Sequence, residues 1–310
     1  MANPDVTIAS PSRVDLEAIA EEGVNDASAV RDSTSHMGAS PWTQGRPRRM
    51  APSMEDPMPF DLRGKVAVVT GGSRGLGLEI ARAYAAAGAR LVIASRKGDA
   101  CAAAAADIQA ASGQACVGVA CHVGRWEDCD RLAAAAYEHF GRVDVLVNNA
   151  GMSPLYGSLT DVTAELYDKV FAVNLRGAFR LSALIGARMA AGDGGSIINV
   201  SSIAAVQPTP NELPYAMAKA GLNTMTVGLA RAFGPKVRVN CIMPGPFMTD
   251  ITKAWDLDAF ANVARTMIPL QRGGEPHEVV GAALYFATDA SSYTTGAVLK
   301  IDGGLAFPPA

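Results

Sequence analysis

A tyrosine and a lysine four positions apart are the residues of this sequence best suited to chemistry. Tyr215 and Lys219 lie in a stretch, 215–233, whose pattern predicts a helix, and side chains at this spacing share a helix face. A free tyrosine has a pKa of about 10, but a nearby positive charge favours the phenolate. The Ser202 hydroxyl could hold a carbonyl oxygen beside the phenol. These groups could move a proton while another group moves a hydride.

The Tyr-x-x-x-Lys spacing alone has a second interpretation, an ordinary solvated helix face, because short motifs also arise by chance. The choice between the two depends on the elements that would position Tyr215 and Lys219.

Composition predicts a globular protein with a large core. Of 310 residues, 49% are hydrophobic and 18% are charged, and the formal net charge is −3. This charge gives no electrostatic basis for binding nucleic acid or an anionic membrane. We find no apolar run of about 18 residues and no signal-peptide core, so no membrane helix or signal peptide is expected.

The cysteines and histidines indicate neither disulfides nor a metal. The five cysteines form no Cys-x-x-Cys pair, which predicts reduced, buried thiols and a cytoplasmic location. The histidines are scattered, so no metal site is expected; they are His36, His122, His139 and His277.

Residues 1–59 differ in composition from the rest and are predicted to be a disordered N-terminal extension. They are rich in proline, serine and acidic residues and bury too little apolar surface to offset the entropy of ordering. The basic cluster at 46–49 is interpreted as a solvated linker rather than a binding patch. Met50, Met54 and Met58 are alternative start positions.

Residues 60–310 predict one α/β domain, a Rossmann-like, doubly wound parallel sheet of about seven strands with helices on both faces. Short apolar runs alternate with longer amphipathic stretches, and the runs are apolar throughout, as in a sheet covered on both faces. The expected strands are 66–69, 90–94, 115–120, 145–148, 196–200, 237–242 and 298–301. The expected helices are 75–87, 101–111, 128–140, 164–190, 214–233 and 276–287.

A glycine-rich turn after the first strand predicts a phosphate-binding loop. Thr70 to Gly77 (Thr-Gly-Gly-Ser-Arg-Gly-Leu-Gly) runs from that strand into a helix. Gly71 suits a tight turn, and Gly75 and Gly77 let the backbone approach a pyrophosphate. The N–H groups of the helix start favour an anion. The loop residues expected to contact a dinucleotide are Gly71, Ser73, Arg74, Gly75, Leu76 and Gly77.

The end of the second strand indicates which dinucleotide. An acidic residue there would bind the ribose hydroxyl of NAD, but this chain has Ser95, Arg96 and Lys97. Two cations and a hydroxyl suit a 2′-phosphate, and Arg74 adds a third cation. We therefore predict NADP(H) over NAD(H). The alternative is that Arg96 and Lys97 are solvated loop charges.

From Asp61 to Phe307 the order of these motifs resembles the short-chain dehydrogenase/reductase family of the single-domain type. Tyr215 and Lys219 follow Ser202 at the family's usual spacing, after an Asn-Asn-Ala-Gly motif at 148–151 and Asn174 in the fourth helix. Further matches are the Thr-Gly-x-x-x-Gly-x-Gly loop at 70–77, 238–245 with Thr249, and Asp-Gly-Gly at 302–304. The resemblance makes residues 60–310 a single Rossmann-fold oxidoreductase domain.

The resemblance assigns roles to these residues. Tyr215 would be the general acid for reduction and base for oxidation, Ser202 would orient the carbonyl, and Lys219 would lower the tyrosine pKa and bind the nicotinamide ribose. Asn174 would hold a water that links Lys219 to solvent. The cofactor site would also include His122, Val123, Asn148, Ala150, Gly151, Pro244, Gly245, Phe247 and Thr249. Asn149 and Gly303 with Gly304 have structural alternatives, a tie between strands and a turn.

One departure concerns the adenine. The family commonly has Asp-Val after the third strand, and this chain has His122-Val123. Either an imidazole acceptor replaces the carboxylate, or the Val123 backbone alone holds the adenine.

The expected substrate pocket is mostly apolar. Its expected segments are 152–156, 203–210 and a loop from 246 to about 268. The first two carry no Arg or Lys and the loop only Lys253 and Arg265, which favours a neutral ketone or aldehyde, or the corresponding alcohol. The expected lining is Met152, Pro154, Leu155, Tyr156, Ile203, Val206, Phe247, Met248 and Trp255. An oxoacyl-thioester reductase and a catalytically idle cofactor-binding scaffold stay as alternatives. The family usually forms tetramers or dimers, and Leu222, Met225, Leu229 and Phe233 could supply such a face or pack in the core.

Overall fold

The computed structural model describes residues 60–249 and 256–306. The predicted extension, residues 1–59, lies outside the described residues. The elements in chain order are β1 (Val66–Thr70), α1 (Gly75–Ala86), β2 (Arg90–Ser95), α2 (Gly98–Ser112), β3 (Cys116–Ala120), α3 (Trp126–Phe140), β4 (Val145–Asn148), α4 (Ala164–Phe171), α5 (Gly177–Ala191), β5 (Gly195–Val200), α6 (Leu213–Phe233), β6 (Val237–Pro244), α7 (Leu257–Met267), α8 (Val280–Ala287) and β7 (Val298–Ile301).

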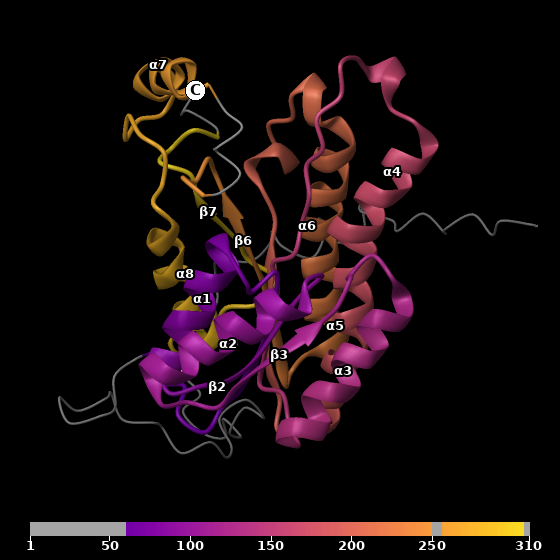
Figure 1. Ribbon diagram of the computed structural model, residues 1–310, viewed down its shortest axis with the longest axis vertical. Coiled ribbons are helices and arrows are strands. Elements are labelled where there is room, and N and C mark those ends of the chain that lie inside the picture. The colour runs from indigo at the N-terminus through magenta and orange to yellow at the C-terminus, as the bar shows by residue number, and fades with distance from the viewer. Residues whose placement is uncertain (1–59, 250–255, 307–310) are drawn as a thin grey trace, which may run out of the picture. The chain divides into compact units, whose positions relative to one another are not determined.

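The strands form one seven-stranded parallel sheet in the order β3-β2-β1-β4-β5-β6-β7. Figure 1 shows α1, α2 and α8 along one face of the sheet and α3, α5 and α6 along the other. The chain winds outward from β1 to β3, then returns to place β4 on the other side of β1. The predicted doubly wound fold is confirmed.

Each face of the sheet packs against its own apolar core. In β1 the side chains of Ala67 and Val69 enter one core and that of Val68 enters the other. The residues of β1 are fully buried, which explains why its sequence is apolar without alternation. Strand positions predicted from such runs agree with the structure to within two residues at each end.

Residues 164–191 form a continuous helical stretch that contains a π-helical turn. The sequence predicts one helix here, but Ala172–Arg176 is wound as a π-helix between α4 and α5. At 28 residues the stretch is long and apolar enough to cross a membrane. The sequence predicts no such segment because charged residues interrupt the apolar run. Half of the apolar window is buried inside the fold, as in a core helix that covers a sheet.

One prediction for the second half of the chain needs correction. Helix α7 was not predicted, because it lies in a segment that the sequence assigns to a loop. On α6, three of the four residues expected either at an interface or in the core contact the core. Leu222 is 1% exposed, and Leu229 and Phe233 pack against the core under α5 and α6.

Candidate active site

The chemistry-bearing residues gather at the carboxyl edge of the sheet. They follow β1, β4, β5 and β6, and in parallel strands these ends lie at one edge. The strand order reverses between β1 and β4, and open α/β sheets bind ligands in the crevice at such a point. The topology therefore brings the glycine loop, the Asn-Asn-Ala-Gly segment and α6 to one place.

Ser202 is held by the turn that follows β5. Its hydroxyl accepts a hydrogen bond from the Ala204 N–H at 3.2 Å, and residues 203–205 form a 3-10 turn. The neighbouring Ser201 hydroxyl donates to the Lys219 carbonyl at 3.1 Å and ties β5 to α6. This tie places the side chain of Tyr215 beside Ser202, with which it shares a hydrogen bond.

The Lys219 ammonium is buried below Tyr215. It is 3% exposed and donates to the Val200 carbonyl at 2.7 Å. Its nitrogen lies 5.6 Å from the centre of the Tyr215 ring. Burial lowers the pKa of Lys219 to about 8, because the charged form loses its hydration.

The pKa of Tyr215 moves in the direction opposite to the prediction. Burial raises it to about 12; the hydrogen bond with Ser202 opposes this rise, and the Glu212 carboxylate adds to it. Lys219 does not reverse the shift, since its ammonium is directed at the Val200 carbonyl. The phenol is therefore protonated at neutral pH, the form required to donate a proton.

Asn174 lies in the π-helical turn and joins it to the loop after β4. Its Oδ1 accepts from the Met152 N–H at 3.0 Å, and its Nδ2 donates to the Met152 and Val170 carbonyls at 2.8 and 2.9 Å. A Cβ added at Gly151 would lie 2.9 Å from Asn174 Oδ1 and 3.4 Å from Lys219 Nζ. Both atoms therefore border the same small space beside Gly151.

The glycine loop has the backbone that the sequence predicts. Gly71 and Gly75 have φ of +67° and +55°, in the region that favours glycine. A Cβ at Gly77 would lie 2.4 Å from the Gly71 carbonyl oxygen, whereas one at Gly75 would meet nothing closer than Thr249 at 3.8 Å. The backbone thus leaves no room for a side chain at Gly77, whereas the space beside Gly75 is open. Thr249 faces that opening.

Asn149 ties β4 to the glycine loop, which confirms its structural alternative. Its Nδ2 donates to the Thr70 carbonyl at 2.9 Å, and the Thr70 hydroxyl accepts from the N–H groups of Asn149 and Ala150. Asn148 has a different position. Its Nδ2 donates to neighbours in the core, but among the described residues its buried Oδ1 has no partner.

A recess of about 160 Å³ lies beside Asn148. Thr70, Val123, Asn148 and Ala150 are among its walls, so it lies between the glycine loop and the end of β3. A buried carbonyl oxygen without a donor is rare in folded proteins. The amide oxygen is therefore an unused acceptor beside this recess, whose walls are too close to admit a water-sized sphere.

The predicted phosphate-binding cations lie at the mouth of the loop. Ser73 donates to the Ser95 hydroxyl at 3.0 Å, which joins the glycine loop to the end of β2. The three cations Arg74, Arg96 and Lys97 are exposed. None forms a salt bridge with a carboxylate of the described residues.

His122 cannot act as the predicted imidazole acceptor while it has this geometry. Its Nδ1 accepts from the Gly124 N–H at 3.1 Å, and the Asp128 carboxylate accepts from its backbone N–H at 2.9 Å. In neutral imidazole one nitrogen accepts and the other donates. Since Nδ1 accepts, Nε2 carries the proton and presents a donor.

The strand-six residues divide between the crevice and the core. Pro244 ends β6, and Gly245 donates to the Ile301 carbonyl at 2.9 Å and packs on Asp302. Phe247, predicted to contact the cofactor, is 7% exposed and packs in the core against Gly274. Gly303 and Gly304, with φ of +65° and +91°, form the turn that the structural alternative proposes.

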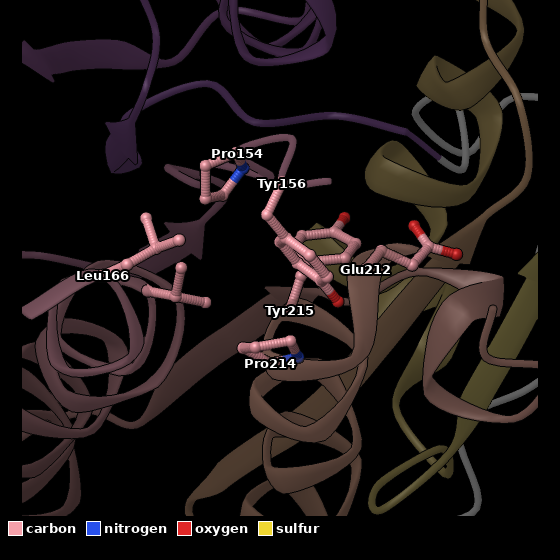
Figure 2. A pocket seen from close by; sticks show the side chains of 7 residues that line it. Pro154, Tyr156, Leu166, Glu212, Pro214 and Tyr215 are labelled. Atoms are coloured by element: carbon pink, nitrogen blue, oxygen red, sulfur yellow. The ribbon is translucent and has the colours of Figure 1, made fainter. Parts of the chain in front are cut away.

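A narrow recess of about 180 Å³ borders Tyr215 (Figure 2). Its walls are too close to admit a water-sized sphere. Pro154 and Tyr156 were predicted to line it; four further residues were not, namely Leu166, Val170, Glu212 and Pro214. The other described residues of the predicted lining are not among its walls, namely Met152, Leu155, Ile203, Val206, Phe247 and Met248. Leu155 is 83% exposed, and Phe247 is in the core. Trp255 lies outside the described residues.

The Tyr156 hydroxyl joins the recess to the start of α6. It donates to the Pro210 carbonyl at 2.7 Å and accepts from the Leu213 N–H at 2.8 Å. A signal for two of the missed wall residues, Glu212 and Pro214, existed in the sequence, because they precede Tyr215 by only a few positions. Leu166 and Val170 come from α4, and nothing in the sequence places them here.

Known proteins resemble this chain over most of its length. Residues 71–306 match the family model described as enoyl-(acyl carrier protein) reductase. Dehydrogenase/reductase SDR family member 4 of Bos taurus is 38% identical over 245 residues, which are 78% of this chain and 88% of the relative. L-rhamnose 1-dehydrogenase (NAD(P)(+)) of Azotobacter vinelandii is 41% identical over 248 residues, or 78% and 96% of the two chains.

The same agreement extends to solved structures. L-sorbose reductase from Gluconobacter frateurii, complexed with NADPH and L-sorbose, superposes with a TM-score of 0.77 and 31% identity, covering 81% of this chain and 100% of that one. Residues 71–306, which the family model matches, include strands β2 to β7 and the residues at their carboxyl edge. This chain is therefore a member of the short-chain dehydrogenase/reductase family, an oxidoreductase of carbonyl and alcohol groups.

Proposed function

We propose that this protein is an NADP(H)-dependent oxidoreductase that interconverts a neutral ketone or aldehyde and an alcohol, with Tyr215 as the general acid and base. The observation that carries the proposal is the position of Ser202, Tyr215 and Lys219 at the same sheet edge as the glycine loop. When bound there, the cofactor supplies or accepts the hydride.

The residues at this edge fit a dinucleotide. The backbone above Gly75 is open, and the start of α1 directs N–H groups toward an anion. The unpartnered Oδ1 of Asn148 offers an acceptor in the neighbouring recess. The exposed cations Arg74, Arg96 and Lys97 support a 2′-phosphate and hence NADP(H). L-sorbose reductase, whose structure is described as a complex with NADPH, adds support.

The proton chemistry follows from burial. During reduction the hydroxyls of Ser202 and Tyr215 would hold the carbonyl oxygen, and Tyr215 would donate its proton as negative charge develops on that oxygen. A buried phenol with a pKa of about 12 holds that proton at neutral pH. The Lys219 ammonium would then stabilise the phenolate, and a water beside Gly151, between Asn174 and Lys219, would return the proton.

The test compares wild type with a Tyr215→Phe variant. The assay follows the loss of NADPH absorbance with neutral ketones, aldehydes, sugars and oxoacyl thioesters as candidate substrates. Loss of the acid should lower kcat by about 10²–10⁴-fold while the dissociation constant for NADP stays within about threefold. The matched control is Tyr293→Phe, because the Tyr293 side chain is fully exposed. More than a tenth of wild-type activity in Tyr215→Phe contradicts the proposed acid.

We also propose that the protein forms a homo-oligomer, a tetramer or dimer, with α4 and α5 at the interface. Tyr167 on α4 and Phe179 on α5 are exposed by 38% and 46%, on helices that cover the sheet. Light scattering of the purified protein gives the mass directly.

A further inference from the structure

An acidic residue stands at the edge of the recess beside Tyr215. Glu212 ends the 3-10 turn at 210–212, directly before α6 and three positions ahead of Tyr215. It lines the same recess as Tyr215, and Figure 2 shows its side chain beside those of Tyr156 and Tyr215. Its negative charge contributes to the raised pKa of Tyr215.

Hydrogen bonds within the turn at 209–213 position Glu212. The Thr209 hydroxyl donates to Glu212 Oε1 at 3.2 Å, and the Glu212 N–H donates to the Thr209 carbonyl at 3.3 Å. The Tyr156 hydroxyl holds the residues on either side of Glu212 through Pro210 and Leu213. The turn and the hydrogen bond from Thr209 place the carboxylate at the edge of the recess.

No positive charge of the described residues compensates this carboxylate. None of the described lysines or arginines forms a salt bridge with Glu212. The side chain is half-buried, and burial raises its pKa. One Oε1 lone pair is used by Thr209, which leaves several acceptor sites on the carboxylate.

The rest of the recess is apolar or neutral. Pro154, Leu166, Val170 and Pro214 present hydrocarbon, and the Tyr156 hydroxyl is already engaged on both sides. At the edge of such a recess a single charged acceptor decides which polar groups can lie beside Tyr215 and how they are oriented. A negative charge favours hydrogen-bond donors and opposes anions.

We propose that Glu212 selects the substrate, favouring carbonyl compounds that carry a hydrogen-bond donor a few bonds from the carbonyl and rejecting those that carry a carboxylate there. The donor is a hydroxyl, as in a sugar or polyol, or an ammonium. Its hydrogen bond to the carboxylate holds the reacting carbonyl under the hydroxyls of Ser202 and Tyr215. This inference rests on the proposed function, because it assigns the recess to the substrate of that reaction.

The experiment compares three methyl ketones, of which acetopropanol and levulinate are of similar size. Acetopropanol carries a hydroxyl, levulinate a carboxylate and diethylaminopentanone an ammonium. We expect wild-type kcat/KM for acetopropanol to exceed that for levulinate by at least about tenfold, since charges in a partly buried site interact strongly. Glu212→Gln has nearly the same shape and no charge, so it should reduce this ratio by about tenfold, through KM for levulinate.

The matched control is Glu138→Gln, the same change at an exposed position of α3. It should leave the ratio unchanged. The ammonium ketone identifies the preferred donor: if it exceeds acetopropanol in wild type and loses this advantage in Glu212→Gln, the donor is an ammonium, and the reverse order identifies a hydroxyl. An unchanged ratio in an active Glu212→Gln variant overturns the inference.

Calorimetric binding of the same ketones to the NADP-saturated protein separates this inference from the proposed function. Tighter binding of acetopropanol than of levulinate, abolished by Glu212→Gln, supports the role of Glu212 even if no carbonyl is reduced. In that case only the proposed reaction fails. Equal binding of the two ketones to wild type overturns the inference.

Discussion

Replacing Lys219 by methionine should stabilise the protein at neutral pH while it disables the proposed reaction. Lys219 is 3% exposed, and burial lowers its pKa from 10.5 to about 8. Because one pKa unit corresponds to about 1.4 kcal/mol, holding the charged ammonium in the folded protein costs about 3 kcal/mol. Methionine has a similar length and no charge, but it loses the hydrogen bond to the Val200 carbonyl, a loss of about 1–2 kcal/mol. The net gain is about 1–2 kcal/mol, or about 2–6 °C in Tm.

The gain should depend on pH in a defined window. Below pH 8 the folded and the unfolded chain both carry the Lys219 proton, so the whole penalty is present. Between pH 8 and 10.5 the folded chain releases this proton while the unfolded chain retains it. The unfolded state then binds more protons, so wild-type stability rises relative to the variant as pH rises. Near pH 10.5 the variant has no advantage left.

The assay is urea unfolding of wild type and Lys219→Met at neutral pH and near the top of this window, without added nucleotide. The difference between the two proteins isolates Lys219 from other groups that titrate there. Lys169→Met is the matched control, since Lys169 is exposed on α4. A variant that is less stable than wild type at neutral pH, by an amount that stays constant with pH, refutes the reasoning.

Three further predictions concern the cofactor edge. Arg96→Ala should lower kcat/KM with NADPH by about tenfold or more and leave NADH nearly unchanged, because a charged bond to the 2′-phosphate is lost; equal losses with both contradict it. In His122→Asp, the ratio of the dissociation constants for NADP and for its hypoxanthine analogue, measured by fluorescence, should change by about tenfold in favour of NADP. The reason is that the Gly124 N–H leaves the proton on Nε2 of His122, which can donate to the carbonyl oxygen of hypoxanthine, whereas a carboxylate accepts from the amino group of adenine. An unchanged preference contradicts this tautomer. Gly77→Ala should lower the free energy of unfolding by about 2 kcal/mol or more, because its Cβ would lie 2.4 Å from a carbonyl oxygen. Gly228→Ala, where a Cβ meets nothing within 4 Å, is its control in urea unfolding, and equal effects contradict the steric account.

The sheet could be predicted from the sequence because its signal is local. Each strand of a doubly covered parallel sheet is an apolar run of a few residues, as in Val66–Thr70. The glycine loop was equally readable, since Gly71 and Gly75 adopt the φ values that require glycine. Helix α7 was missed because its buried side is small. Ala264 is buried, but apolar residues such as Leu257 and Met267 are exposed and obscure the helical pattern.

The electrostatics of the site could not be predicted from spacing. The interval between Tyr215 and Lys219 indicates neighbours on a helix, but not that the ammonium donates to the Val200 carbonyl or that burial outweighs its charge. The tautomer of His122 depends likewise on a backbone N–H two residues away. Glu212 was not predicted because the Tyr-x-x-x-Lys motif begins at Tyr215, although the turn before it lines the same recess.

Helix α6 has no capping side chain of its own, and this makes its first turn a reporter for the loop after β4. The Leu213 N–H is satisfied by the Tyr156 hydroxyl, which comes from a segment 57 residues earlier in the chain. If that loop lifts away, the helix loses its cap in the same event, since helix-terminal N–H groups have no partner within the helix. Amide hydrogen exchange at Leu213 therefore records opening of the loop, and a ligand that seals the recess should slow exchange at this single backbone position.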